Sequence, residues 1–133
     1  MNPLYPVVAQ RALFMCEYCQ APQDGTATPL EIEHIRLTAD KGTNDLNNLA
    51  IACRSCNQFK HKATVGMDPQ TSMQVPLLDP RRDEWDEHFF YEPETFSVVG
   101  ETPVGRATVA RLQMNNPFQN AARRIWRAAG LPF

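Results

Sequence analysis

The chain has 133 residues, the size of one domain. Its 15 acidic and 13 basic side chains give a net charge of −2, which excludes a uniformly basic, nucleic-acid-coating surface. No apolar run approaches the ~18 residues of a membrane-spanning helix. Residues 1–10 also lack the pattern of a signal peptide. We therefore expect a cytoplasmic protein without a membrane partner.

The first half of the chain predicts the order helix, turn, strand, strand, helix. Residues 5–15 favour a short helix, and Cys16-Glu-Tyr-Cys19 is typical of a tight turn that presents two thiols. Residues 30–35 alternate apolar and polar side chains, which predicts a strand. The elements expected next are a polar loop over 38–48, a strand over 49–52 and a helix from Arg54.

The second half carries helix starts and chain breakers but no catalytic motif. Residues 66–80 are expected to be irregular, and residues 85–92 and 96–99 favour a hairpin. Thr102-Pro103 and Asn116-Pro117 are typical helix starts, because a capping side chain precedes a proline. The first helix is expected to extend to about 115 and the second to 130. The second is expected to bury an apolar stripe made of Phe118, Ala122, Ile125 and Ala129.

Four cysteines form two Cys-x-x-Cys pairs, Cys16 with Cys19 and Cys53 with Cys56. Zinc favours four thiolates in a tetrahedron, and its ligands commonly come in pairs two residues apart. In a reducing compartment such pairs are typical of metal sites rather than disulfides. The pattern predicts a structural zinc ion that stabilises the fold. The alternative is a set of buried or redox-active cysteines.

A second group of polar residues lies between and after the cysteine pairs. Asn57 and His61 are spaced i, i+4 and are expected to share one face of a helix that crosses the strand carrying Glu33 and His34. A carboxylate, an amide oxygen and an imidazole suit a divalent ion, and a second histidine suits a general base. Adjacent residues of a strand point to opposite faces. A bulge or twist is therefore needed to bring both Glu33 and His34 to the site.

With these residues, the sequence resembles the HNH endonucleases, also called ββα-metal nucleases, in the branch with a four-cysteine zinc site. The resemblance is carried by the segments Cys16-Glu-Tyr-Cys19, Glu33-His34-Ile35, Asn48-Leu49, Cys53-Arg-Ser-Cys56-Asn57 and Lys60. It covers roughly half of the chain. Two departures stand out, since the family more often has aspartate where this chain has Glu33, and Asn57 replaces the last histidine of the family name.

The resemblance implies a role for each matching residue. His34 is expected to be the general base, and Asn48 to fix the loop between the strands and orient His34. Glu33, Asn57 and His61 are expected to hold a catalytic Mg²⁺, Mn²⁺ or other divalent ion. Contacts with nucleic acid are expected from nearby cations, although solvated surface charges are the alternative for each. These cations are Arg36, Arg54, Lys60 and Lys62.

The sequence thus predicts an α+β fold. Residues 1–66 are expected to form a treble-clef ββα-metal core with a four-cysteine zinc site. Residues 67–133 are expected to form a hairpin and two-helix extension, packed on the core as one compact domain. The expected function is metal-dependent hydrolysis of DNA phosphodiester bonds by a monomer or homodimer, with RNA as another substrate. The alternative is a non-catalytic zinc-binding treble-clef module that binds nucleic acid or protein.

Overall fold

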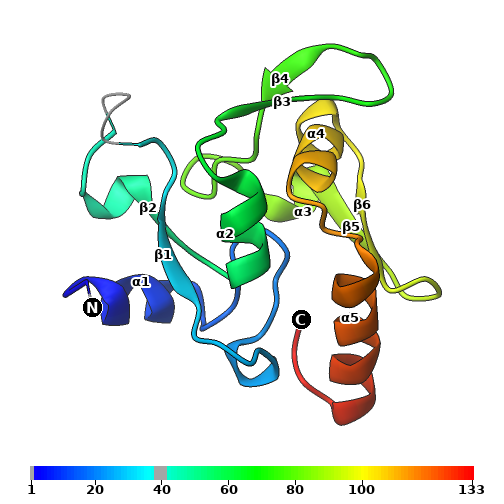
Figure 1. The fold of residues 1–133 in the computed structure, drawn as a ribbon, viewed down its shortest axis with the longest axis horizontal. Coiled ribbons are helices and arrows are strands. Elements are labelled where there is room, and N and C mark those ends of the chain that lie inside the picture. Colours follow the sequence, from blue (N-terminus) through cyan, green and yellow to red (C-terminus); the bar gives the residue numbers. More distant parts are fainter. Residues whose placement is uncertain (1, 38–41) are drawn as a thin grey trace.

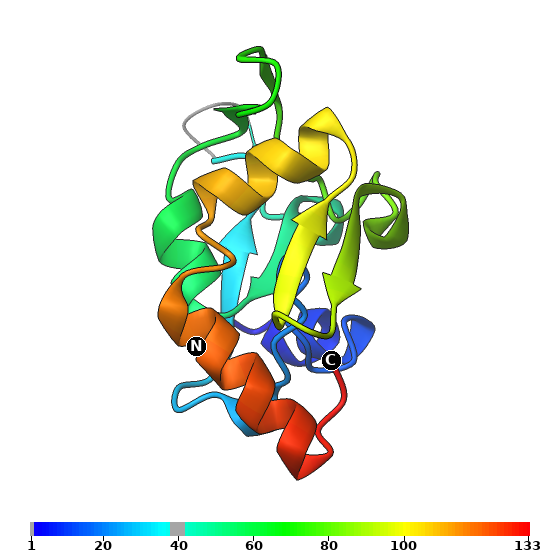
Figure 2. The ribbon, with the colours of Figure 1, turned by 90° about the vertical axis from the view of Figure 1, so that its right-hand side faces the viewer.

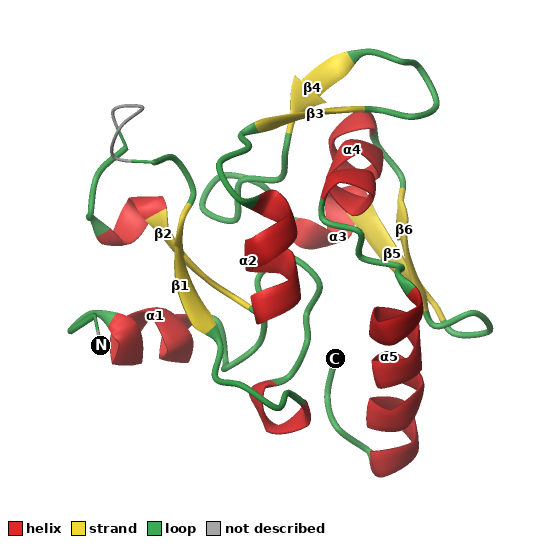
Figure 3. Ribbon diagram, in the orientation of Figure 1, coloured by secondary structure: helices red, strands yellow, loops and turns green. Residues whose placement is uncertain are grey.

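The computed structural model describes residues 2–37 and 42–133. Within them, the fold is α+β, with five α-helices and three two-stranded antiparallel sheets. Figures 1 and 3 show α1 and the β1–β2 hairpin on one side of the molecule, α2 in the middle, and α4, α5 and the β5–β6 hairpin on the other side. In Figure 2, α4, α5 and the β5–β6 hairpin lie in front of β1 and β2. No helix in the described ranges is both long and apolar enough to cross a membrane.

The N-terminal helix is shorter than predicted. Helix α1 spans Tyr5–Arg11, and the next residues turn back so that the amide of Phe14 donates to the carbonyl of Ala9. Leu13 and Phe14 both have positive φ angles, 55° and 57°, which ends the helix before the first cysteine. The predicted helix to residue 15 was therefore too long by about a turn.

The central strand–strand–helix order is confirmed. Strand β1 (Glu31–His34) pairs antiparallel with β2 (Leu49–Ala52), and α2 (Arg54–Lys60) follows. Four successive pairs, from Glu31↔Ala52 to His34↔Leu49, run without a bulge. Cys53 caps α2, because its sulfur accepts a hydrogen bond from the amide of Cys56. The loop predicted over 38–48 lies partly outside the described residues.

The segment expected to be irregular forms an arm. Strands β3 (Val65–Met67) and β4 (Gln74–Pro76) pair as a hairpin that projects at the top of Figure 1. Asp68 ends β3 with its side chain fully buried, and it accepts two hydrogen bonds from the guanidinium of Arg106. The prediction missed this hairpin because three-residue strands around an Asx turn give too little alternation to detect.

The remaining elements follow the predicted order with changed bounds. The first part of the expected strand over 85–92 is the short helix α3 (Trp85–His88), so the hairpin consists of β5 (Phe89–Glu92) and β6 (Ser97–Gly100). Helix α4 (Pro103–Arg111) begins at the predicted Thr102 cap but ends before residue 115. Helix α5 (Pro117–Ala129) begins at the Asn116 cap and ends at Gly130, whose φ of 75° suits glycine.

Helix α5 buries the face one residue on from the predicted stripe, a rotation of about 100°. The stripe expected in the core is mostly outside, with Phe118 87% and Ile125 61% exposed. The buried positions are Gln119, Arg123 and Trp126. Polar side chains enter the interior here because each finds partners. The guanidinium of Arg123 donates to the carbonyls of Phe96 and Met114 and to the side chains of Asn115 and Asn120.

Hydrogen bonds join the C-terminal half to the N-terminal half. The indole of Trp85 donates to the carbonyl of Tyr18, and the indole of Trp126 donates to the carbonyl of Gly25. Leu49, Ile51, Phe89 and Leu112 are fully or almost fully buried in one apolar cluster that spans both halves. The extension is therefore packed on the segment that carries the cysteines and the β1–β2 hairpin.

Candidate metal centre and catalytic site

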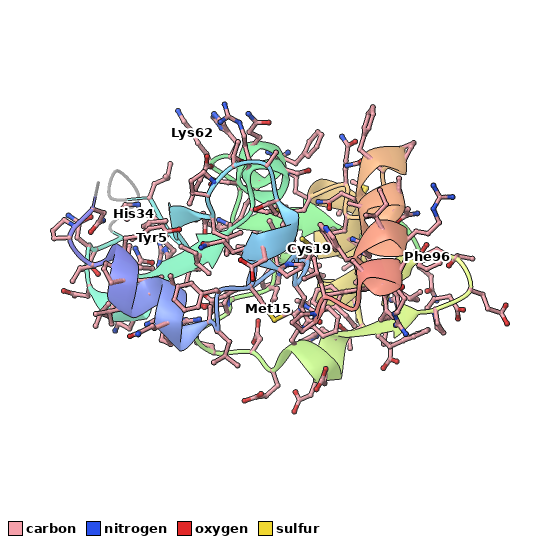
Figure 4. All side chains as sticks on the ribbon, turned by 90° about the horizontal axis from the view of Figure 1, so that it is seen from below. Tyr5, Met15, Cys19, His34, Lys62 and Phe96 are labelled. Atoms are coloured by element: carbon pink, nitrogen blue, oxygen red, sulfur yellow. The ribbon has the colours of Figure 1, made fainter. Side chains whose placement is uncertain are left out.

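The four cysteines lie together in the interior. Their sulfur atoms all fall within 4.8 Å of one another, and Cys19 Sγ is 3.6 Å from Cys53 Sγ. Thiolates at ~2.3 Å from one tetrahedral zinc ion would be ~3.8 Å apart. Figure 4 places Cys19 near the middle of the molecule. We refer to these residues as the four-cysteine centre. Their spacing and chemistry fit a zinc ion, as predicted.

Local backbone geometry places the four sulfurs. Within each pair, the second cysteine's amide donates to the first cysteine's sulfur at 3.4 Å, both in the Cys16 turn and at the start of α2. The two turns are brought together by the β1–β2 hairpin, which ends one residue before Cys53. A further bond links the first turn to β2, because the amide of Glu17 donates to the carbonyl of Ile51.

The protonation of the centre reflects its burial. Burial raises the pKa of the Cys16 thiol, and hydrogen bonding with Cys16 and Cys19 raises that of Cys56. Hydrogen bonds from the other thiols lower the pKa of Cys53. Four sulfurs this close cannot all carry a negative charge unless a cation lies among them. The centre is therefore built to be completed by a metal cation.

The last helix also reaches the four-cysteine centre. The amide nitrogen of Gln119, on α5, lies 3.9 Å from Cys53 Sγ and 4.0 Å from Cys19 Sγ, and the side chain is buried. Hydrogen bonds to ligand sulfurs orient them and stabilise their charge. Sequence reasoning missed Gln119, because no local pattern links a residue of the last helix to cysteines a hundred positions earlier.

Glu33, predicted to hold the catalytic ion, is enclosed by protein groups. It is 4% exposed, its Oε2 accepts a hydrogen bond from the Tyr18 hydroxyl at 2.7 Å, and its Oε1 pairs with the ammonium of Lys60. Burial raises the pKa of Glu33, while the charge of Lys60 opposes that rise. Lys60 also donates to the carbonyl of Ile35. Its ammonium thus points inward rather than toward a phosphate at the surface, where the sequence analysis placed it.

His34 lies on the opposite face of β1 from Glu33. Because β1 pairs with β2 without a bulge, the side chains of these neighbours diverge, and the local distortion that the sequence analysis required is absent. The half-buried imidazole of His34 has its Nε2 atom 2.7 Å from the side-chain oxygen of Asn44. An amide oxygen only accepts hydrogen bonds, so in the neutral tautomer that suits this contact Nε2 is the donor and Nδ1 is left without a proton.

Asn48 joins the two ends of the loop between the strands. Its side-chain oxygen accepts from the amide of Arg36 at 3.0 Å, and its nitrogen donates to the carbonyls of Arg36 and Thr43. Its own carbonyl accepts from the amide of Ile35. These four bonds hold the backbone on both sides of His34 and Asn44. The role of Asn48 in orienting His34 stays a prediction.

Asn57 and His61 are both on or next to α2, but not as a simple helical pair. The amide nitrogen of Asn57 donates to Glu31 Oε1 at 2.8 Å, so its side chain meets β1 at Glu31 rather than at Glu33. His61 follows the last residue of α2 and has a φ of 51°, which turns its exposed side chain out of the helical repeat. Helix α2 therefore ends one residue before His61, so Asn57 and His61 do not form the predicted i, i+4 pair on one helical face.

The predicted divalent-ion ligands do not form one group. In residues 2–37 and 42–133, the four cysteines are the one set of three or more His, Cys, Asp or Glu side chains whose ligand atoms lie within 4.8 Å of one another. Glu33, His34 and His61 form no such set. The residues as arranged do not fit a closed protein cage for a second ion.

The basic residues divide into exposed and buried groups. Arg36, Arg54 and Lys62 are exposed, and Figure 4 shows Lys62 extending at the outer edge. Arg123 on α5 is 1% exposed and bonded to backbone carbonyls. Arg127 lies over the rings of Tyr91 and Phe133. The exposed arginines of α5 are therefore Arg124 and Arg127.

The comparisons with known proteins bear on the same segment. Residues 16–63 match the family model described as HNH endonuclease, about a third of the chain. Searches of curated proteins and of solved structures return no significant match. The matched residues begin at the first cysteine and end just beyond His61, so they contain the four-cysteine centre, the β1–β2 hairpin and α2. The segment that carries the four-cysteine centre is thus similar to the HNH endonucleases.

Proposed function

We propose that this protein is a metal-dependent endonuclease that hydrolyses phosphodiester bonds in DNA. The observation that carries the proposal is the contact of His34 Nε2 with the side-chain oxygen of Asn44, 2.7 Å away within the matched segment. In this proposal Nε2 carries the proton and Nδ1 is the base. Asn48 fixes the loop that supplies Asn44. A positioned base of this kind contributes ~10²–10⁴-fold to the rate of proton transfer.

The chemical step follows from that geometry. Nδ1 of His34 takes a proton from water as the water oxygen forms a bond to phosphorus. The bond between phosphorus and the 3′ oxygen breaks, and the leaving oxygen takes a proton from solvent. The products are a 5′-phosphate and a 3′-hydroxyl. A divalent ion, when bound, stabilises the negative charge that develops on the phosphate and the leaving oxygen.

The second ion requires a revised set of contacts. Mg²⁺ usually keeps several waters and takes one or two protein ligands together with phosphate oxygens, so a closed protein cage is unnecessary. We propose that Asn57 and His61 supply such contacts, because both lie on the matched segment and neither is buried. Glu33, enclosed by Tyr18 and Lys60, acts in this proposal by holding β1 against α2.

The structural ion is proposed to be zinc, held by the four cysteines in the reducing cytoplasm. Exposed Arg36, Arg54 and Lys62 are proposed to contact phosphates, which positions a strand without reading its sequence. A monomer with one such site nicks one strand at a time, whereas a homodimer cuts both strands.

A plasmid-nicking assay tests this function. The zinc-loaded protein is incubated with supercoiled plasmid and Mg²⁺, Mn²⁺ or Ni²⁺, beside the variant His34→Ala, with zinc content and circular dichroism measured for both. Nicking that requires the added ion and falls with His34→Ala supports the proposal. Equal nicking by the variant contradicts it. A labelled RNA arm identifies the preferred nucleic acid.

A second candidate function rests on a specific observation. Among the described side chains only the four cysteines converge as metal ligands, which is the arrangement of a non-catalytic zinc-binding module, here with a treble-clef fold, that binds nucleic acid or protein. This alternative predicts one tightly held zinc ion per chain and no nicking with any added divalent ion.

A further inference from the structure

A groove separates the second half of α2 from the start of α5. It has a volume of about 440 Å³, and aromatic rings from both helices border it. Phe59 is 37% and Phe118 is 87% exposed, although large apolar side chains usually bury most of their surface. The groove residues are Ser55, Phe59, Gln113, Asn116, Pro117, Phe118 and Gln119.

Hydrogen bonds of Asn116 hold the backbone at the α5 side of the groove. The side-chain oxygen of Asn116 accepts from the amides of Phe118 and Gln119, and its nitrogen donates to the carbonyl of Gln113. Gln119 is anchored against the four-cysteine centre. Phe118 therefore stands on a fixed backbone, and binding against its ring costs little conformational entropy.

The charge around the groove favours a negatively charged partner. The groove residues carry no charge, and neither of the segments that supply them, 46–67 and 102–133, contains an aspartate or glutamate. Arg54 on α2, Arg111 on α4 and Arg124 on α5 are all exposed. Uncharged aromatic walls on segments that carry exposed arginines and no acidic residue resemble sites where bases stack while cations meet the backbone.

We propose that this groove holds an unpaired base of the nucleic-acid strand, stacked against Phe118 and Phe59. The inference rests on the proposed function and extends it to a substrate class, namely strands that offer an unpaired base beside the cleavage site. Ser55 and Phe59 lie on α2 two residues to either side of Asn57 and on a different face, so a strand with a base in the groove would cross α2 to reach the proposed ion contacts. The exposed amide of Gln113 is available to the edge of the base.

The test separates base stacking from backbone attraction. Binding of the zinc-loaded protein to a labelled single-stranded oligo-dT is measured by fluorescence anisotropy, without added divalent ion. An abasic oligonucleotide with the same sugar–phosphate backbone is the comparison, and an oligo-rU arm distinguishes RNA from DNA. We expect tighter binding to oligo-dT than to the abasic strand. Phe118→Ala is expected to weaken oligo-dT binding about 5- to 150-fold and to leave abasic binding unchanged.

Ile125→Ala is the matched control, because Ile125 is also exposed and apolar on α5 but does not border the groove. It is expected to bind like the parent, and Phe118→Trp is expected to keep the preference for bases. Equal binding of oligo-dT and the abasic strand by the parent overturns the inference. Equal losses from Phe118→Ala and Ile125→Ala also overturn it, because the groove ring then contributes no more to base binding than an exposed side chain outside the groove.

Failure of this inference is distinguishable from failure of the proposed function. Ion-dependent nicking of plasmid without any preference for bases over the abasic strand removes the groove proposal and keeps the nuclease. Base-dependent binding without cleavage by any added ion keeps the groove as a nucleic-acid site and removes the nuclease.

Discussion

The amide nitrogen of Gln119 lies 3.9 Å from the sulfur of Cys53, and this contact ties the last helix of the chain to its metal centre. The same nitrogen is 4.0 Å from Cys19 Sγ, so one side chain approaches a sulfur from each Cys-x-x-Cys pair. Because ligand sulfurs lose charge stabilisation when such a donor is removed, the metal affinity of the centre depends on α5 as well as on the four cysteines.

Replacing Gln119 by leucine is expected to weaken zinc binding about 10- to 100-fold, the usual range for residues that orient metal ligands. Competition with a chromophoric chelator measures the affinity and the rate of zinc release. Gln113→Leu is the matched control, because Gln113 is exposed and touches no cysteine. Zinc release at the parent rate from Gln119→Leu contradicts a role for this amide.

The contact between His34 and Asn44 predicts a graded loss of cleavage. His34→Ala removes the base and is expected to slow cleavage by ~10²–10⁴-fold. Asn44→Leu leaves the base but frees the imidazole, so its loss should be smaller. Asn44→Asp keeps an acceptor of the same size and is expected to recover much of the rate. Single-turnover cleavage of a labelled strand measures all three.

Zinc content is the control for these three variants, since none of them touches the four-cysteine centre. If Asn44→Leu cleaves as fast as the parent, Asn44 does not position the base. If Asn44→Asp is as slow as Asn44→Leu, the side chain of residue 44 acts by its shape rather than by accepting a hydrogen bond.

The buried pair of Glu33 and Lys60 predicts strong coupling in stability. Removing one partner leaves an uncompensated buried charge, so Glu33→Gln or Lys60→Met alone is expected to cost about 3–5 kcal/mol of unfolding free energy. The double variant should cost less than the sum of the two. Urea unfolding of the zinc-loaded proteins measures this cycle. Strictly additive losses contradict the pairing.

The same variants test the assignment of Glu33 to structure rather than to the divalent ion. Where Glu33→Gln remains folded, the concentration of Mn²⁺ that gives half-maximal cleavage is expected to match that of the parent. An increase of tenfold or more in that Mn²⁺ concentration would instead indicate that Glu33 helps to bind the ion.

The Asp68–Arg106 pair predicts a pH-dependent difference in stability. The hydrogen bonds from Arg106 lower the pKa of Asp68 below its ordinary value. Its contribution is therefore complete above the pKa of an unfolded aspartate, about 3.9, and is lost as the pH falls toward the lower folded value. The unfolding free energies of the parent and of Asp68→Asn should differ by a constant amount above about pH 5 and converge below about pH 4.

Unfolding both chains in parallel at each pH makes the loss of zinc in acid common to the two measurements. A difference that stays constant down to pH 3 is the result that contradicts this account.

Helix α5, whose buried face was predicted wrongly, shows the limit of a prediction from sequence patterns. The caps of α5 at Asn116 and Gly130 are local and were predicted correctly. Its buried face was not, because Gln119 and Arg123 are buried only through partners far along the chain, such as Cys19 and Phe96. From the residue type alone, a polar side chain is expected to be exposed, because burying it without a hydrogen-bond partner is unfavourable. The distant partner that makes burial favourable cannot be identified from the neighbouring residues.

The candidate site also has a part that the sequence predicted correctly and a part that it did not. Cysteine spacing is a local signal, and it predicted the four-cysteine centre. The relation of Glu33 to His34 depends on whether β1 contains a bulge, which sequence alternation does not reveal. Asn44 belongs to no motif, and the Cys-x-x-Cys turn that contains Tyr18 does not mark this residue as the partner of Glu33.

The contact between Gln119 and the cysteines also sets an order of assembly during synthesis. Translation proceeds from the N-terminus, so all four cysteines are made more than sixty residues before the end of α5. A zinc ion captured by this nascent segment stays open to water and to chelating thiols on the side that α5 later covers. The newly made chain is thus most vulnerable to demetallation in the interval before its last helix docks.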